Sequence, residues 1–198
     1  MRITGGTFGG RNLPSSGFAG IRPTTDRARE TIFNILQNHI ALEGTQVLDL
    51  CAGTGALGFE AMSRGAASVV LVEKHRGNAE LLRKSAQMLG VDAETRILCA
   101  DCVKAISLLE QPETQEKYQL EARNLIFCDP PYAAKLINPV FQVLAESPFI
   151  HAEAVFVAEH DIREVVIIPR LWEKFAERLF GETQVEFFRR EKGQLEEL

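Results

Sequence analysis

The segment Val47-Leu-Asp-Leu-Cys-Ala-Gly53-Thr-Gly55-Ala-Leu-Gly58 decides the fold of this chain. Its apolar first half predicts a buried strand, and its second half predicts a glycine turn that opens a helix. Glycine tolerates positive φ and lets a ligand approach the backbone, while the first N–H groups of the helix are free to bind it. Glu73 ends the next apolar run, where it can accept hydrogen bonds from a ribose. The segment therefore predicts a nucleotide-binding loop.

Around this segment, short apolar runs alternate with amphipathic helices, which predicts an α/β fold with a largely parallel sheet. A terminal antiparallel hairpin is expected around Gly181, between two strand-like runs. The expected strands are 46–50, 68–73, 95–100, 124–128, 154–159, 174–180 and 184–190. The expected helices are 56–64, 78–89, 103–109 and 136–146, and residues 111–122 are expected to form a polar loop.

The N-terminal residues differ from the rest of the chain in charge and composition. Met1–Leu13 contains four glycines between short β-compatible pieces, which predicts a hairpin with little core of its own. A helix up to about Asn38 follows it. Residues 1–29 carry five arginines against one acidic residue, although the net charge of the chain is −5. This basic edge can meet a polyanion locally, or it can merely solubilise a loose end. The arginines are Arg2, Arg11, Arg22, Arg27 and Arg29.

Composition limits the protein class. A chain of 198 residues with 45% hydrophobic and 25% charged residues is expected to form one globular domain. The absence of an apolar leader or a long apolar run favours a cytoplasmic protein without membrane contact. Cys99 and Cys102 have a spacing seen in metal sites, but a zinc site needs about four ligands, so we expect no metal. The cysteines (Cys51, Cys99, Cys102, Cys128) are expected to be buried thiols in a reducing compartment.

Two acidic residues distinguish between cofactors. A carboxylate at Asp49, four residues before Gly53, suits the cationic amino acid end of S-adenosylmethionine. The pyrophosphate of a nicotinamide cofactor would gain nothing from that negative charge. Asp101 ends the third predicted strand, where it can hold the adenine amino group or cap the helix that follows.

A second motif, Asn124-Leu-Ile-Phe-Cys-Asp129-Pro130-Pro131-Tyr132, carries the acceptor chemistry. The two prolines fix φ and remove N–H donors, so the chain leaves the strand in one rigid shape. A carboxylate and a proline carbonyl held together can accept both hydrogens of an exocyclic base amine. Tyr132 offers a flat face for the base. With the amine aimed at the sulfonium methyl, the transfer is an in-line displacement that depends mainly on positioning.

These residues resemble the Asp/Asn-Pro-Pro-Tyr amino-methyltransferases of nucleic acid bases. Met1-Arg-Ile-Thr-Gly-Gly, Arg22-Pro-Thr-Thr-Asp-Arg-Ala-Arg-Glu-Thr-Ile-Phe-Asn34 and the loop up to Gly65 make the resemblance more specific. Together with Asp129–Tyr132 they are similar to the RsmD family, guanine-N2 methyltransferases of bacterial small-subunit ribosomal RNA. The resemblance implies a Rossmann-like sheet of seven strands, mostly parallel with an antiparallel terminal strand. It also implies an N-terminal β-hairpin (1–22) that contacts RNA, followed by a methyltransferase domain (23–198).

The resemblance implies a role for each matching residue. Asp129, Pro130, Pro131 and Tyr132 would hold the target guanine. The cofactor site would comprise Asp49, Ala52, Gly53, Gly55, Glu73, Lys74, Asp101 and Cys102. Arg2, Arg11, Arg22 and Arg27 would contact ribosomal RNA, either naked or in an assembled small-subunit particle. Two features depart from the family pattern, namely Cys51 in place of an aromatic residue and the run 163–168. The alternative function is a DNA adenine or cytosine amino-methyltransferase.

Overall fold

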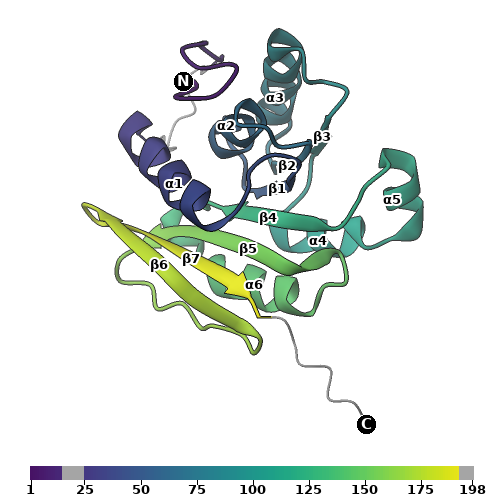
Figure 1. Ribbon diagram of the computed structural model, residues 1–198. Coiled ribbons are helices and arrows are strands. Elements are labelled where there is room, and N and C mark those ends of the chain that lie inside the picture. Colours follow the sequence, from purple (N-terminus) through teal and green to yellow (C-terminus); the bar gives the residue numbers. More distant parts are fainter. Residues whose placement is uncertain (15–24, 192–198) are drawn as a thin grey trace.

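The computed structural model describes residues 1–14 and 25–191 (Figure 1). Within these residues one sheet of seven strands runs in the order β3-β2-β1-β4-β5-β7-β6. Neighbouring strands from β3 to β5 pair in parallel, whereas β7 is antiparallel to both β5 and β6. The strands are β1 Gln46–Leu50, β2 Ser68–Val72, β3 Thr95–Leu98, β4 Arg123–Cys128, β5 Ile150–Asp161, β6 Trp172–Phe180 and β7 Thr183–Arg190.

Helices cover both faces of this sheet, so the protein has three layers (Figure 1). One apolar core packs α1, α2 and α3 against one face, through residues such as Phe33, Phe59 and Leu82. The other core packs α4 and α6 against the opposite face, through residues such as Ile106 and Phe141. The helices are α1 Asp26–His39, α2 Ala56–Ser63, α3 Arg76–Leu89, α4 Cys102–Leu109, α5 Pro112–Tyr118 and α6 Ile137–Glu146, and the 3-10 turn η1 is Tyr132–Ala134.

This architecture confirms the predicted α/β fold and the terminal hairpin. The predicted element ends lie within two residues of the observed ones, except that β5 begins at Ile150 rather than at residue 154. The prediction of a polar loop at 111–122 is wrong, because α5 lies inside it. None of the α5 residues is buried, so the helix has no apolar period. Pro112 at its first turn, Glu113 near its start and Lys117 near its end favour the helix instead.

Residues Met1–Leu13, here called the N-terminal loop, fold back on themselves with limited β-structure. Arg2 and Asn12 form an isolated antiparallel bridge. The Leu13 N–H donates to the Met1 carbonyl (2.7 Å). Ile3 and Leu13 are buried in the core that α1–α3 share with the sheet. The loop is therefore attached to the main body, and the expected boundary at residue 22 lies outside the described residues.

The connection from β5 to β6, residues 162–171, is the part of the described chain richest in exposed aliphatic side chains. Val165 and Ile167 are 79% and 61% exposed. Asn138 on α6 fixes the connection, since its Nδ2 donates to the Val165 carbonyl (2.9 Å) and its Oδ1 accepts from the Ile167 N–H (2.7 Å). Residues 163–168, which do not match the family pattern, are thus held against α6.

Among the described residues, no helix combines the length and apolar character that crossing a membrane requires.

Candidate cofactor and acceptor site

The register of the sheet brings the two sequence motifs together. Leu50 at the end of β1 pairs with Val72 on one side and with Cys128 on the other, and Val72 pairs with Leu98. Four parallel strands therefore end level with one another, and the residues that follow them gather at one edge of the sheet. This edge carries the predicted site residues Gly53, Glu73, Asp101 and Asp129. The strand register therefore places the two motifs at the same end of the sheet.

The turn between β1 and α2, residues 51–55, is here called the glycine loop. Gly53 and Gly55 have φ angles of 53° and 76°, as the sequence predicts for a glycine turn. A Cβ on Gly55 would lie 2.5 Å from the Phe59 ring, so the packing of α2 itself requires this glycine. A Cβ on Gly53 would have no neighbour closer than 3.9 Å. The backbone at Gly53 is therefore open to a ligand.

Glu73 holds the glycine loop to the end of β2. Its Oε2 accepts a hydrogen bond from the Gly53 N–H (2.9 Å), and its Oε1 accepts from the His75 N–H (2.7 Å). The side chain is buried, although the neighbouring Lys74 is exposed. The carboxylate is thus fixed beside the loop, where the sequence places the ribose. The contact of Lys74 with a cofactor stays a prediction.

Asp49 lies beneath the glycine loop, in the interior. Its side chain is 2% exposed, and its Oδ2 accepts a hydrogen bond from the Gly58 N–H on α2 (2.9 Å). Burial raises the pKa of Asp49 to about 8; the Gly58 hydrogen bond opposes that shift, whereas the charges of Asp129 and Glu73 add to it. A buried carboxyl of this kind becomes ionised readily when a cation is placed beside it.

We expect the free energy of unfolding of the Asp49→Asn variant to depend less on pH than that of the native protein. Asp49 is protonated when folded and ionised when unfolded above pH 4, so its contribution to stability is lost as pH rises through about 8. Between pH 5 and 8 this loss amounts to about 4 kcal/mol in the free energy of unfolding. Asparagine keeps the acceptor for the Gly58 N–H and does not titrate. Urea unfolding of both proteins at several pH values measures the difference, and parallel pH profiles would contradict the raised pKa.

Asp101 caps α4, which is one of the two roles expected from the sequence. Its Oδ1 accepts a hydrogen bond from the Val103 N–H (3.2 Å). Its contact with an adenine amino group stays a prediction, as does that of its buried neighbour Cys102. A hydrogen bond with Cys51 and burial raise the pKa of the Cys102 thiol. The expectation that all four cysteines are buried is wrong for Cys99, which is exposed, and for Cys51, which is half-buried.

The segment Asp129–Tyr132 turns away from the sheet directly after β4. Asp129 is half-buried, Pro130 is buried and Pro131 is exposed, so the turn is open to the surface. The Pro131 carbonyl accepts a hydrogen bond from the Ala134 N–H (2.8 Å), which closes η1. Tyr132 begins η1, and the stacking role expected of its ring stays a prediction. The rigid turn required of the two prolines is therefore present beside the glycine loop.

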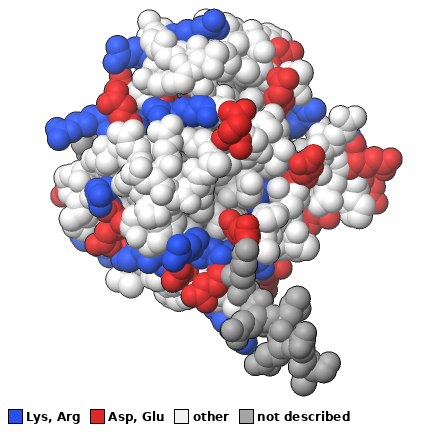
Figure 2. All heavy atoms as spheres, in the orientation of Figure 1, with Lys and Arg blue, Asp and Glu red and all other residues white. Residues whose placement is uncertain are grey.

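The basic N-terminal edge is only partly available at the surface. Arg2 is half-exposed and lies 3.2 Å from Asp26, and Arg11 lies over the Phe8 ring. Arg27 is exposed, and Arg22 lies outside the described residues. Arg29 is buried and donates to Asp26 (2.6 Å), so it is structural. In Figure 2 basic side chains lie at the upper left, the region of the N-terminal loop and α1 in Figure 1.

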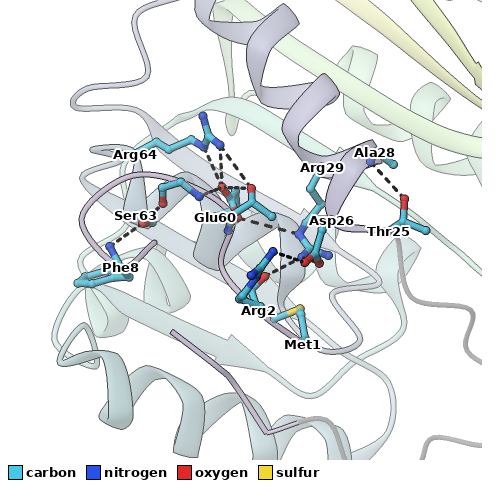
Figure 3. Close-up of polar contacts among 12 residues, drawn as sticks. Met1, Arg2, Phe8, Thr25, Asp26, Ala28, Arg29, Glu60, Ser63 and Arg64 are labelled. Carbon is cyan, nitrogen blue, oxygen red and sulfur yellow. Dashed lines mark hydrogen bonds and ion pairs between the residues drawn. The ribbon is translucent and has the colours of Figure 1, made fainter. Parts of the chain in front are cut away.

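The sequence analysis missed Glu60 on α2, which is fully buried (Figure 3). Its carboxylate accepts hydrogen bonds from the Thr4 N–H (2.8 Å), the Thr4 hydroxyl (2.7 Å) and the Gly5 N–H (2.9 Å). Arg64 also binds it at 2.9 Å. Glu60 therefore fastens the N-terminal loop to the helix that begins at the glycine loop. The sequence signal is an acidic residue within an otherwise apolar helix.

Within residues 1–14 and 25–191, no three His, Cys, Asp or Glu side chains are placed to hold a metal ion.

Comparisons with known proteins agree with this geometry. The family model described as conserved hypothetical protein 95 matches residues 1–189. Ribosomal RNA small subunit methyltransferase D of Escherichia coli K12 is 34% identical over 192 residues, which cover 96% of this chain and 90% of that protein. A solved structure described as putative methyltransferase yhhF from Escherichia coli superposes with a TM-score of 0.82 at 28% identity, covering 97% and 98% of the two chains.

A more distant solved structure shares the fold alone. An RNA methyltransferase from Salinibacter ruber in complex with S-adenosyl-L-homocysteine superposes with a TM-score of 0.63 at 14% identity. The superposition covers 89% of this chain and 99% of that one.

Proposed function

This chain belongs to the conserved hypothetical protein 95 family, the RsmD family that its motifs resemble, and from this we propose that it is an S-adenosylmethionine-dependent rRNA methyltransferase. Its acceptor is the exocyclic N2 amine of a guanine in small-subunit ribosomal RNA. The observation that carries this proposal is the Asp129–Tyr132 turn at the same sheet edge as the glycine loop. An open turn beside a ligand loop is what transfer between two bound molecules requires.

The residues at this edge fit the cofactor. The Gly53 backbone leaves space for it, and the Glu73 carboxylate lies where a ribose can donate hydrogen bonds. Asp49 gives up its proton to become the counter-charge for a cationic ligand. When bound, S-adenosylmethionine supplies an electrophilic methyl group on a sulfonium. The remaining residues proposed to line the site are Ala52, Gly55, Lys74, Asp101 and Cys102.

The Asp129 carboxylate and the Pro130 carbonyl hold the guanine amine by accepting its two hydrogens. We assign the Pro130 carbonyl to this role because the Pro131 carbonyl already accepts from the Ala134 N–H. The lone pair of the nitrogen would then face the methyl group that the cofactor supplies, so that an N–C bond would replace the S–C bond and S-adenosylhomocysteine would leave. Asp129 would stabilise the positive charge that develops on the nitrogen, and the proton that the nitrogen then loses would pass to solvent. Tyr132 stacks on the extruded base.

Arg2, Arg11, Arg22 and Arg27 are proposed to contact RNA phosphates. The N-terminal loop presents Arg2 and Arg11 as fixed cations rather than on a loose end, because Glu60 fastens it. Phosphate contacts position the RNA without reading its sequence. We propose that the substrate is ribosomal RNA, including its form in the assembled small-subunit particle, and that the protein acts in the cytoplasm.

The double variant Arg2→Ala/Arg11→Ala is expected to bind RNA more weakly and with less dependence on salt. Each lost phosphate contact reduces the slope of log affinity against log salt concentration by about 0.7 to 0.9. The slope is therefore expected to fall by about 1.5, measured by filter binding at several salt concentrations. The control is Lys104→Ala/Lys117→Ala, which removes two exposed cations from α4 and α5. Equal salt slopes in the two double variants would contradict the phosphate role.

Mapping the methylated nucleosides of ribosomal RNA by mass spectrometry tests the proposed function. Ribosomal RNA and DNA from cells with and without this protein are compared. Loss of one N2-methylguanine from small-subunit RNA is the expected result. A change confined to methyladenine or methylcytosine in DNA would instead support the alternative of a DNA amino-methyltransferase.

A further inference from the structure

The N-terminal loop contacts the glycine loop directly. The Thr54 hydroxyl, between Gly53 and Gly55, donates a hydrogen bond to the Met1 sulfur (Oγ1 to Sδ, 3.1 Å). Ile3 and Leu13 share an apolar core with Ala52 of the glycine loop, and Met1 packs against it. The part of the chain that carries Arg2 and Arg11 is thus attached to the loop expected to surround the cofactor.

The same N-terminal loop is also fixed at the other end of α2. The Thr7 N–H donates to the Ser63 carbonyl (2.7 Å), and the Phe8 N–H donates to the Ser63 hydroxyl (2.9 Å). The two backbones are so close that a Cβ on Gly6 would lie 1.8 Å from the Ser63 carbonyl oxygen. Glu60 and Ser63 thus hold residues 4–8 against α2, and the Met1–Thr54 contact joins the start of the N-terminal loop to the glycine loop.

We propose that Thr54 is a positioning residue that couples RNA binding to cofactor binding. This inference rests on the proposed function, because RNA is the ligand of the N-terminal loop. RNA that binds Arg2 and Arg11 restrains the N-terminal loop, and Met1 then restrains Thr54 in its cofactor-binding position. The cofactor then no longer has to order the glycine loop around Thr54 when it binds, so the affinity of the protein for the cofactor rises. By linkage, the cofactor strengthens RNA binding by the same factor.

The test measures cofactor affinity with and without RNA in three proteins. Equilibrium dialysis gives the Kd of radiolabelled S-adenosylhomocysteine for the native protein, Thr54→Val and Thr54→Ser. Saturating small ribosomal subunits from cells that lack this protein serve as the RNA ligand. Valine removes the donor and keeps a similar shape, whereas serine keeps the hydroxyl as the matched control.

We expect the ribosomal subunits to lower the Kd about fivefold for the native protein and for Thr54→Ser. For Thr54→Val we expect the subunits to change the Kd by less than twofold, whatever the Kd of this variant is in their absence. Hydrogen exchange is expected to show that subunits protect residues 51–58 in the native protein and much less so in Thr54→Val. A role confined to stability would shift both Kd values together and leave their ratio unchanged.

Three results would overturn this inference. The first is a decrease in the Kd of Thr54→Val on adding subunits that is as large as in the native protein. The second is a loss of cofactor affinity in Thr54→Val that is equal with and without subunits, which would make Thr54 a direct cofactor contact. The third is a native protein that methylates these subunits but shows no tightening, in which case the proposed function stands. A native protein that fails to methylate them overturns the proposed function and this inference with it.

Discussion

The rate of methyl transfer by the Asp129→Ala variant is expected to fall about a hundredfold to a thousandfold, while the variant still binds cofactor. Asp129 would accept a hydrogen of the amine and stabilise the charge that develops on its nitrogen. Alanine leaves the Pro130 carbonyl alone to orient the amine. We expect the glycine loop to keep its shape, because the Gly53 N–H binds the Glu73 carboxylate. Transfer of a labelled methyl group to small ribosomal subunits measures activity, and calorimetry measures cofactor affinity.

Two further variants show whether the carboxylate itself is needed. Asp129→Asn keeps one acceptor oxygen in the same place, so we expect it to retain more activity than alanine. Asp92→Ala removes an exposed carboxylate from the loop after α3 and serves as the control, with native activity expected. Native activity in Asp129→Ala would contradict the acceptor site. Loss of cofactor binding in step with activity would mean that Asp129 holds the cofactor instead.

The Glu60→Ala variant is expected to destabilise the protein by about 3 to 5 kcal/mol. The substitution leaves the mostly buried Arg64 and the Thr4 and Gly5 N–H groups without their anionic partner (Figure 3). It also removes one of the two carboxylates beside the buried Arg29, which keeps Asp26. For a protein of this size each kcal/mol lowers the midpoint of thermal unfolding by about 2 to 4 °C. We therefore expect the midpoint to fall by about 10 °C, measured by calorimetry or circular dichroism.

Glu80→Ala is the matched control for this prediction. Glu80 also lies on a helix and faces an arginine, but its side chain is 59% exposed and that of Arg76 is 89% exposed. Exposed ion pairs of this kind contribute little, so we expect a change below about 0.5 kcal/mol. A similar midpoint for Glu60→Ala and Glu80→Ala would show that the N-terminal loop does not depend on the buried carboxylate.

The site at the sheet edge could be predicted because topology decides it. Once parallel strands are inferred, the residues that follow them must gather at one edge, whatever their packing. Gly53, Glu73 and Asp129 follow such strands, and the strand register brings the ends of these strands level. Their individual hydrogen bonds were not predictable. Glu73 binds the Gly53 N–H only because the glycine turn happens to direct that group toward it.

Other features depend on contacts that local sequence patterns do not record. Glu60 lies on an otherwise apolar helix, and its partners Thr4 and Gly5 are more than fifty residues away in the chain. From its sequence context Arg29 would be expected at the surface, whereas the structure places it beside Asp26 and Glu60. No residue of the helix α5 is buried, so its sequence does not need an apolar period and shows none. In each case a polar partner or a capping residue, rather than hydrophobic periodicity, decides the structure.

The position of β7 bears on how the protein is synthesised. Among the described strands β7 is translated last, yet it pairs with β5 on one side and β6 on the other. Its Phe188 ring lies 4.8 Å from that of Phe141 and 6.1 Å from that of Phe156. A nascent chain that has reached only residue 182 therefore exposes the edge of β5 and an incomplete aromatic cluster. The sheet closes only after β7 has been translated.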